Sequence, residues 1–247
     1  MKLAFICELA GTVRQGGEHL AIVRLSEKLR SMGHTVDLYS YSSHKLETKI
    51  STRIPIKLLA LPFVRDIFIS PWIGRTLFRR IDSKGYDFIV TATTTIAAII
   101  KPKTRIIFIC HAIRSQKFVI LSSIKKYKLF FNPLTYAIMS LVEKRSFKQA
   151  CKIITIRDHQ RSFLLNNFNL RPESVKVISN GIDSNSFAPL PLAKKNQVIF
   201  VGRGTIPKGI DTLIDSAEQI NASVLLVLSK IDKDLEAKAL QNKNIEM

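Results

Sequence analysis

The chain has 247 residues, 46% of them hydrophobic, with 10 glycines, 9 prolines and a formal net charge of +19. This length and composition are typical of one large or two modest globular domains and exclude a collagen-like or disordered chain. The three cysteines are far apart and form no CxxC pair, which argues against a disulfide framework or a zinc cluster and favours a reducing cytoplasm.

The positive charge is concentrated in the segment 101–150, which holds eleven basic residues and one acidic residue, Glu143. Such asymmetry indicates a polyanionic partner, either anionic lipid or nucleic acid. No helix-turn-helix, RRM or zinc signature appears, so no nucleic acid partner is expected. Apolar residues lie between the cations, and together with the charge they suggest peripheral binding to an anionic membrane: Phe118, Ile120, Leu121, Phe130 and Phe131. The alternative is helix packing within the first domain, since such apolar residues are more often in a core than in contact with lipid.

No export signal or membrane-spanning helix is expected. Glu8 interrupts the first apolar stretch, and no small-residue cleavage site follows it. Charges or prolines break every longer apolar stretch, for example at Lys57 and Arg65, well short of the roughly 18 residues that a spanning helix needs. The predicted location is cytoplasmic, with peripheral contact to the membrane as an option.

The chain opens with a strand–helix–strand unit. The residues Lys2–Cys7 form a short apolar run that predicts a buried strand. Apolar positions of helical period predict a helix over 20–32, which Gly33 ends, and a strand follows over 35–41. This order indicates a parallel sheet. Further strands are predicted at 87–91, 105–110, 152–156 and 175–178, and helices at 71–84, 116–130 and 133–150.

A proline- and lysine-bearing segment at 184–196 is typical of a linker. We therefore predict two domains, 1–188 and 189–247, each an α/β unit with a parallel sheet. The second domain is expected to hold strands at 197–201 and 223–229 and helices at 209–220 and 232–241.

The strongest binding signal lies at the start of the second domain. An apolar strand that looks buried leads into Gly202-Arg203-Gly204, then Lys208-Gly209, then a helix. Arginine offers a planar fork for phosphate oxygens and lysine a compact charge, so a diphosphate is the natural ligand. Glycine-rich strand–helix turns are common, however, and the two cations would then simply face water.

Two weaker signals lie in the first domain. The Gly16-Gly17 pair follows the first strand and lets a ligand approach the backbone, but it lacks the GxGxxG pattern of a nicotinamide site. His111 follows the strand 105–110, at the edge where open parallel sheets bind ligands, and could hydrogen-bond a sugar hydroxyl; a structural strand-end role fits it equally well. Cys110 is expected to be inert packing, and the other histidines, His19 among them, to lie at the surface or at caps.

These signals occur in a specific order along the chain. Gly16-Gly17-Glu-His-Leu-Ala, Tyr86-Asp-Phe-Ile-Val, Cys110-His111, Asn180-Gly-Ile-Asp183 and Gly202-Arg-(four residues)-Lys-Gly209 follow one another. This series resembles the retaining glycosyltransferases of family 4, which have the GT-B fold. The resemblance runs over essentially the whole chain and is strongest at 178–214.

The resemblance implies two Rossmann-like domains, the first for the acceptor and the second for a nucleotide-sugar donor. By position, Arg203 and Lys208 would hold the donor diphosphate, and Asn180 would also bind the donor. The Gly16-Gly17 loop would line the transfer site and bind the donor there, and His111, the catalytic candidate, would touch the donor sugar. Such enzymes usually need no metal, so neither metal nor cofactor is expected. The activity implied is transfer of a hexose-type unit to a glycan or a lipid-linked acceptor in surface polysaccharide or glycolipid synthesis.

The chain departs from the family pattern in several places. The family's paired glutamates, E-x7-E, would lie beyond Met247, which implies an incomplete second domain and a chain that is a fragment. Ser179 replaces a proline, Arg157 stands where serine is common, and Ser229-Lys230 replaces a Gly-x-Gly loop. The alternative is therefore a non-catalytic protein derived from the same fold that binds an anionic membrane or another polyanion.

Overall fold

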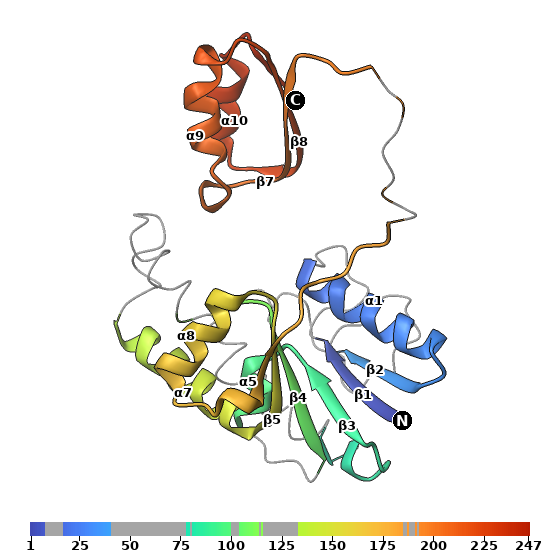
Figure 1. Cartoon of the computed structure of the whole chain (residues 1–247). Helices are drawn as coiled ribbons and strands as arrows, with labels where there is room; N and C mark the ends of the chain where they lie inside the picture. The colour runs from blue at the N-terminus through green and yellow to red at the C-terminus, as the bar shows by residue number, and fades with distance from the viewer. Residues whose placement is uncertain are drawn as a thin grey trace. The chain divides into compact units, whose positions relative to one another are not determined.

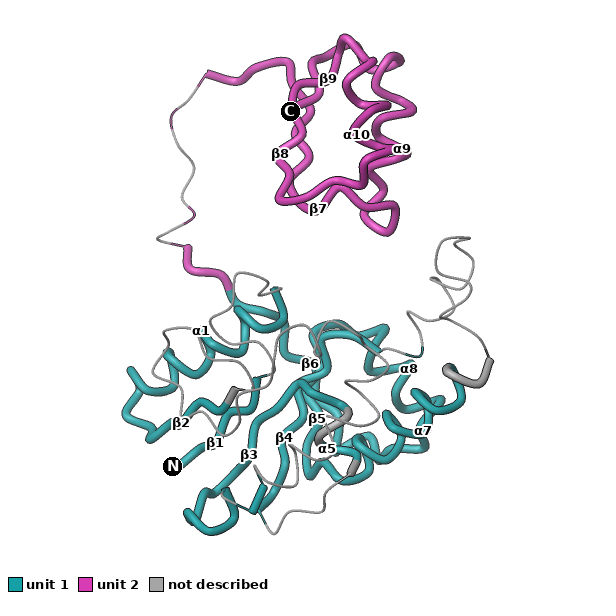
Figure 2. The backbone as a smooth tube through the Cα atoms, turned by 180° about the vertical axis from the view of Figure 1, so that it is seen from behind, with its two compact units in different colours: residues 1–181 teal, residues 182–247 magenta. Residues whose placement is uncertain are grey.

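The computed structural model describes residues 1–7, 17–40, 78–79, 81–99, 104–113, 115, 133–184, 187, 191 and 193–247. The chain forms two compact units, Met1–Gly181 and Ile182–Met247 (Figure 2). This division lies slightly before residue 188, where the sequence places the domain boundary. Each unit has its own parallel sheet and its own hydrophobic core.

The first unit is built on a six-stranded sheet in the order β2-β1-β3-β4-β5-β6, and every neighbouring pair is parallel. The strands are β1 (Lys2–Cys7), β2 (Thr35–Ser40), β3 (Phe88–Thr91), β4 (Arg105–Cys110), β5 (Ala150–Thr155) and β6 (Val175–Val177). All six were predicted as strands, with bounds that differ by at most two residues. The predicted parallel sheet is confirmed.

Helices connect the strands, as parallel pairing requires. They are α1 (Gly17–Ser31), α5 (Thr94–Ile99), α7 (Pro133–Gln149) and α8 (Asp158–Phe168), with a 3-10 helix at Pro172–Ser174. The helices expected over 20–32 and 133–150 are confirmed as α1 and α7. Of the expected helix 71–84, residues 78–79 and 81–82 are helical, and Ser83 and Lys84 form a turn. The rest of that helix lies outside the described residues, as does the whole of the expected helix 116–130.

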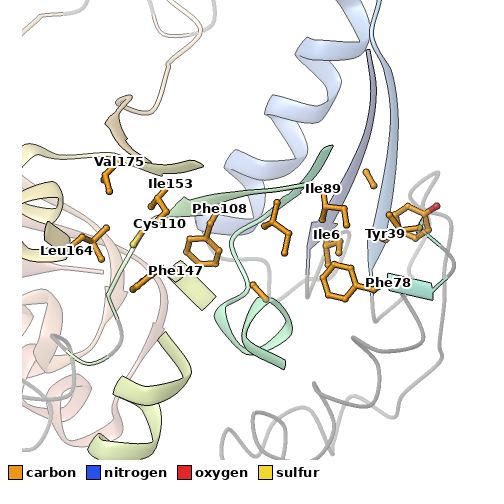
Figure 3. Close-up of a cluster of buried hydrophobic side chains, with 14 of the residues drawn as sticks. Ile6, Tyr39, Phe78, Ile89, Phe108, Cys110, Phe147, Ile153, Leu164 and Val175 are labelled. Carbon is orange, nitrogen blue, oxygen red and sulfur yellow. The ribbon is translucent and has the colours of Figure 1, made fainter. Parts of the chain in front are cut away.

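The two faces of the first sheet carry separate cores, because side chains alternate along each strand. Leu3, Phe5 and Cys7 pack with Ile22 and Val23 of α1 on one face. On the other face, α5, α7 and α8 cover the sheet (Figure 1), and Figure 3 shows part of the cluster that they bury. That cluster includes Ile6, Ile89, Phe108, Cys110, Phe147, Ile153, Leu164 and Val175.

The second unit has a three-stranded parallel sheet in the order β7-β8-β9. Its elements are β7 (Gln197–Gly204), a 3-10 helix (Ile206–Lys208), α9 (Ile210–Ser216), a second 3-10 helix (Ala217–Gln219), β8 (Ser223–Ile231), α10 (Lys233–Leu240) and β9 (Ile245–Glu246). Helices α9 and α10 pack on the same face (Figure 1). The four predicted elements are present, but β7 runs three residues further than expected and β9 was not predicted.

Candidate functional site

The first candidate site lies where the order of the first sheet reverses. β2 follows β1 on one side, whereas β3 and β4 lie on the other side, so the switch point is between β1 and β3. Open α/β sheets bind ligands at such a point, outside the carboxyl ends of the strands. A pocket lies at this place and is lined by Ile6, Cys7, Glu18, His19, Ile22, Ala92 and Thr93.

His111 follows the last residue of β4 and is half-buried. Burial lowers the pKa of its imidazole; Glu18 opposes this shift and His19 adds to it. The ring is therefore mainly neutral near pH 7. Its Nε2 atom is buried and has no hydrogen-bond partner among the described residues. A neutral imidazole with an unused nitrogen is suited to hydrogen-bond a ligand hydroxyl.

The start of α1 faces the same region. Gly17 is its first residue, and a Cβ added there would meet no atom of the described residues within 4 Å. Glu18 and His19, in the first turn of α1, are the groups that influence the pKa of His111 at the end of β4, and both of them line the pocket at the switch point. The structure thus brings two of the predicted site residues, Gly17 and His111, to one region. Gly16 lies outside the described residues.

His19 contacts Cys7 in this pocket, a pairing that the sequence does not reveal. The Cys7 Sγ atom lies 3.3 Å from His19 Nδ1. His19 was expected at the surface or at a cap, yet it lines the pocket. The signal that could have found it is position, because His19 is in the first turn of the helix that follows the first strand.

Threonines fix the end of β3 beside this pocket. Thr91 Oγ1 donates to the Ile6 carbonyl at 3.4 Å and accepts the N–H of Thr93 at 3.1 Å. Both threonines are buried. The first of these hydrogen bonds joins the carboxyl ends of β1 and β3, and the second holds the segment that follows β3.

The second candidate site is the end of β7 in the second unit. Arg203 belongs to β7, and Lys208 ends the 3-10 helix that follows; both side chains are exposed. Three backbone hydrogen bonds hold the intervening turn: Thr205 N–H to Arg203 O at 2.9 Å, Lys208 N–H to Thr205 O at 2.8 Å, and Gly209 N–H to Ile206 O at 2.8 Å. Two cations thus extend from one short, ordered turn.

Glycines make this turn possible. Gly209 has φ +74°, a left-handed conformation that favours glycine. Gly204 is buried and pairs with Ile231 at a register shift in the sheet. Asn180 and Gly181 are exposed and belong to the end of the first unit, outside any helix or strand.

No group of three or more histidine, cysteine, aspartate or glutamate side chains is placed to hold a metal ion in the described part of the chain. Among the helices that the structure describes, none is long and apolar enough to cross a membrane.

The family model described as Glycosyltransferase Family 4 matches residues 16–186. A search of curated proteins found no match. Among solved structures, Alr3699/HepE of Anabaena in complex with UDP has a TM-score of 0.69 and 16% identity, over 100% of this chain and 68% of that one. The catalytic domain of starch synthase IV from Arabidopsis thaliana, bound to ADP and acarbose, has a TM-score of 0.63 and 14% identity, over 99% and 73% of the two chains.

A third structure, S. aureus TarM in complex with fondaparinux, alpha-GlcNAc-glycerol and UDP, has a TM-score of 0.68 and 11% identity, over 100% of this chain and 77% of that one. These likenesses concern the fold. Together with the two parallel sheets, they confirm the predicted α/β class with Rossmann-like units of the GT-B type.

Proposed function

Because the chain belongs to glycosyltransferase family 4, whose members are retaining enzymes that use nucleotide-sugar donors, we propose that it transfers a hexose-type sugar to a glycan or a lipid-linked acceptor. The pathway that we propose is the synthesis of a surface polysaccharide or glycolipid. The observation that carries this proposal is the family match over residues 16–186.

We assign the donor diphosphate to Arg203 and Lys208. Sugar transfer needs departure of a nucleoside diphosphate, and fixed cations stabilise the negative charge that develops on the leaving oxygen. A guanidinium can bind two phosphate oxygens at once, and an ammonium adds a compact charge. The ordered turn between the two residues supports this role, since it limits the positions that the cations can adopt.

We assign the sugar end of the donor to His111 and the Gly16-Gly17 loop, and the region near the donor to Asn180. The neutral imidazole and its unused Nε2 atom support a hydrogen bond to a sugar hydroxyl. The open space at Gly17 supports close approach of a ligand to the backbone at the start of α1.

Nucleotide binding tests the proposed function. We expect the chain to bind UDP, GDP or ADP with one base preferred, and to release that nucleoside diphosphate from its sugar donor when an acceptor glycan is added. Calorimetric titration with the three nucleotides, followed by a coupled assay of nucleoside diphosphate release, measures both steps. Absence of binding to all three nucleotides would refute the proposal.

The exposed face of α7 favours a second property, contact with an anionic membrane. Leu141 is 66% exposed, and Lys144, Arg145 and Lys148 are exposed one and two turns further along. The spacing places all four on one face of the helix. Only part of the basic segment 101–150 is described, and Phe118, Ile120, Leu121, Phe130 and Phe131 lie outside the described residues.

We predict that the Lys144→Gln, Arg145→Gln, Lys148→Gln variant binds vesicles of mixed anionic and neutral lipid at least about tenfold more weakly, because each cation near such a surface contributes about 1 kcal/mol. Co-sedimentation at several salt concentrations measures the effect. The Lys194→Gln, Lys195→Gln, Lys230→Gln variant is the matched control, since it removes the same charge from exposed positions of the second unit. Equal loss in both variants would reject α7 as the contact face.

Vesicle binding without any nucleotide binding would favour the alternative function, a non-catalytic protein that binds an anionic membrane or another polyanion. The two experiments together therefore separate the two candidates.

A further inference from the structure

Two helices hold the segment that carries His111, through hydrogen bonds that span long stretches of sequence. Gln160 of α8 donates its Nε2–H to the backbone carbonyl of His111 at 3.1 Å. Four residues further on, the backbone N–H of Ser115 donates to Oε2 of Glu143, on α7, at 3.1 Å. Between the two anchors, Ile113 is buried in the core. His111 and Ser115 are thus each held by a hydrogen bond, and Ile113 between them is packed in the core.

The two anchoring side chains are buried. Glu143 is 0% exposed and Gln160 is 7% exposed. A carboxylate is costly to remove from water unless hydrogen bonds compensate, and a hydrogen bond from a backbone N–H to a carboxylate is among the stronger ones. Glu143 is also the one acidic residue of the basic segment 101–150. Because its side chain is buried, Glu143 does not neutralise the exposed cations of that segment. It instead accepts a hydrogen bond from Ser115, in the loop that follows β4.

His111 itself is held in a position that its own hydrogen bonding does not explain. Its Nε2 atom is buried with no partner among the described residues, an arrangement that costs free energy and that a mobile side chain would relieve by turning towards water. β4 holds the backbone before His111, and the anchors at His111 O and Ser115 N–H hold the backbone after it, so movement of the His111 backbone is limited.

We propose that Glu143 and Gln160 are positioning residues that hold His111 in the site at the carboxyl end of β4. That this positioning assists sugar transfer rests on the function proposed above. The positioning of His111 by the two residues is independent of that function. A misplacement of about 1 Å in a reacting group can lower a rate on the order of 100-fold. Two buried anchors on one short segment would prevent such a displacement of His111.

The direct test is to titrate the His111 ring in the full chain and to monitor the titration by NMR with isotopically labelled histidine. A His111→Gln variant assigns the His111 signal. In the wild type, burial lowers the pKa of His111, and the titratable groups that influence it are Glu18, which raises the pKa, and His19, which lowers it. In Gln160→Ala and in Glu143→Ala the segment loosens and the ring gains solvent. We therefore expect its pKa to move up towards the ordinary value of a histidine.

Matched controls separate positioning from general stability. Gln149→Ala removes a comparable bond, since Gln149 Nε2 donates to the Ala98 carbonyl at 3.1 Å but does not contact the His111 segment. Ser146→Ala alters a fully buried polar residue one turn from Glu143. Both should leave the His111 titration unchanged. Glu143→Gln keeps an oxygen acceptor for the Ser115 N–H and should retain the wild-type titration, even if Glu143→Ala does not fold.

An unchanged His111 titration in Gln160→Ala, accompanied only by a lower melting temperature, would overturn the proposal. A loss of the wild-type titration in Glu143→Gln would overturn the role of Glu143. These readings need no substrate, so a wild type that binds none of UDP, GDP and ADP would refute the proposed function and leave them intact. If UDP-glucose is turned over, Gln160→Ala should lower kcat on the order of 10- to 100-fold without changing UDP affinity.

Discussion

The Arg203→Ala, Lys208→Ala double variant is expected to bind nucleoside diphosphate at least about 100-fold more weakly than the wild type. A hydrogen bond to a charged group contributes about 1.5–3 kcal/mol. Losing one from each cation therefore costs about 3–6 kcal/mol, and each 1.4 kcal/mol is a factor of ten in affinity. Both side chains are exposed, so their removal should leave the fold of the second unit unchanged.

Calorimetric titration with the preferred nucleotide, at one fixed salt concentration, measures this loss. The Lys194→Ala, Lys195→Ala variant is the control, because it removes two exposed cations from the same unit away from the turn. Arg203→Lys should recover only part of the affinity, since an ammonium cannot bind two phosphate oxygens in the planar geometry of a guanidinium. Wild-type affinity in the double variant would mean that the two cations face only solvent.

The elements that the sequence predicted well are those with a strong local pattern. Strand β4 has the bounds 105–110 that its continuous apolar run indicates, and β1 likewise begins at Lys2 and ends at Cys7. Strands buried on both faces of a parallel sheet read as such runs. α1 follows from its 3.6-residue apolar period, and Gly33, with φ +87°, follows its end as predicted.

The helices and strand that were not predicted lack such a pattern. α5 has six residues and no polar face, and β9 has two residues. α8 begins after Arg157, whose side chain makes no capping hydrogen bond, whereas a serine, common in the family at this place, could cap the helix. The start of α8 is therefore marked only by the acidic Asp158 in its first turn, which is a weak local signal.

β7 shows a different limit. Its apolar run suggests a strand buried on both faces, but Ile199 and Val201 are 57% and 75% exposed. Helices α9 and α10 pack against the alternate residues Val198 and Phe200. Composition alone could not distinguish one covered face from two, because that difference depends on which elements pack against the sheet.

The candidate site divides in the same way. The position of His111 at the carboxyl end of β4 could be predicted, since the strand before it is a clear apolar run, whereas its role in the site stays a prediction. The sequence did not predict the contact between Cys7 and His19, nor the hydrogen bonds by which Gln160 and Glu143 anchor the His111 segment. Their partners lie 12, 49 and 28 residues away in sequence, and only the folded topology brings them together.

Gly204→Val should unfold the second unit locally, at a cost of about 3 kcal/mol or more. A Cβ at position 204 would lie 2.7 Å from Ile231 Cγ1, 2.8 Å from Ile231 Cβ and 3.0 Å from Ile231 Cα. The last of these is a backbone atom, so the overlap cannot be relieved by turning a side chain alone. Overpacking of a buried position costs about 1–3 kcal/mol or more, and valine adds two further methyl groups. A unit as small as Ile182–Met247 has little stability to lose.

Hydrogen exchange measured by mass spectrometry resolves this effect, because it reports β7 and β8 separately from β1 and β4 of the first unit. Protection should fall in the first pair of strands and stay unchanged in the second. Gly209→Ala is the comparator, since φ +74° penalises alanine by about 1–2 kcal/mol while no atom lies within 4 Å of its Cβ. Steric overlap should therefore make Gly204→Val the more severe change, and it should also weaken nucleotide binding, because Gly204 connects Arg203 to the turn that carries Lys208. A Gly204→Val variant with wild-type protection in β7 would show that Ile231 and its strand can move aside, and the glycine would then not be needed for the shape of the turn.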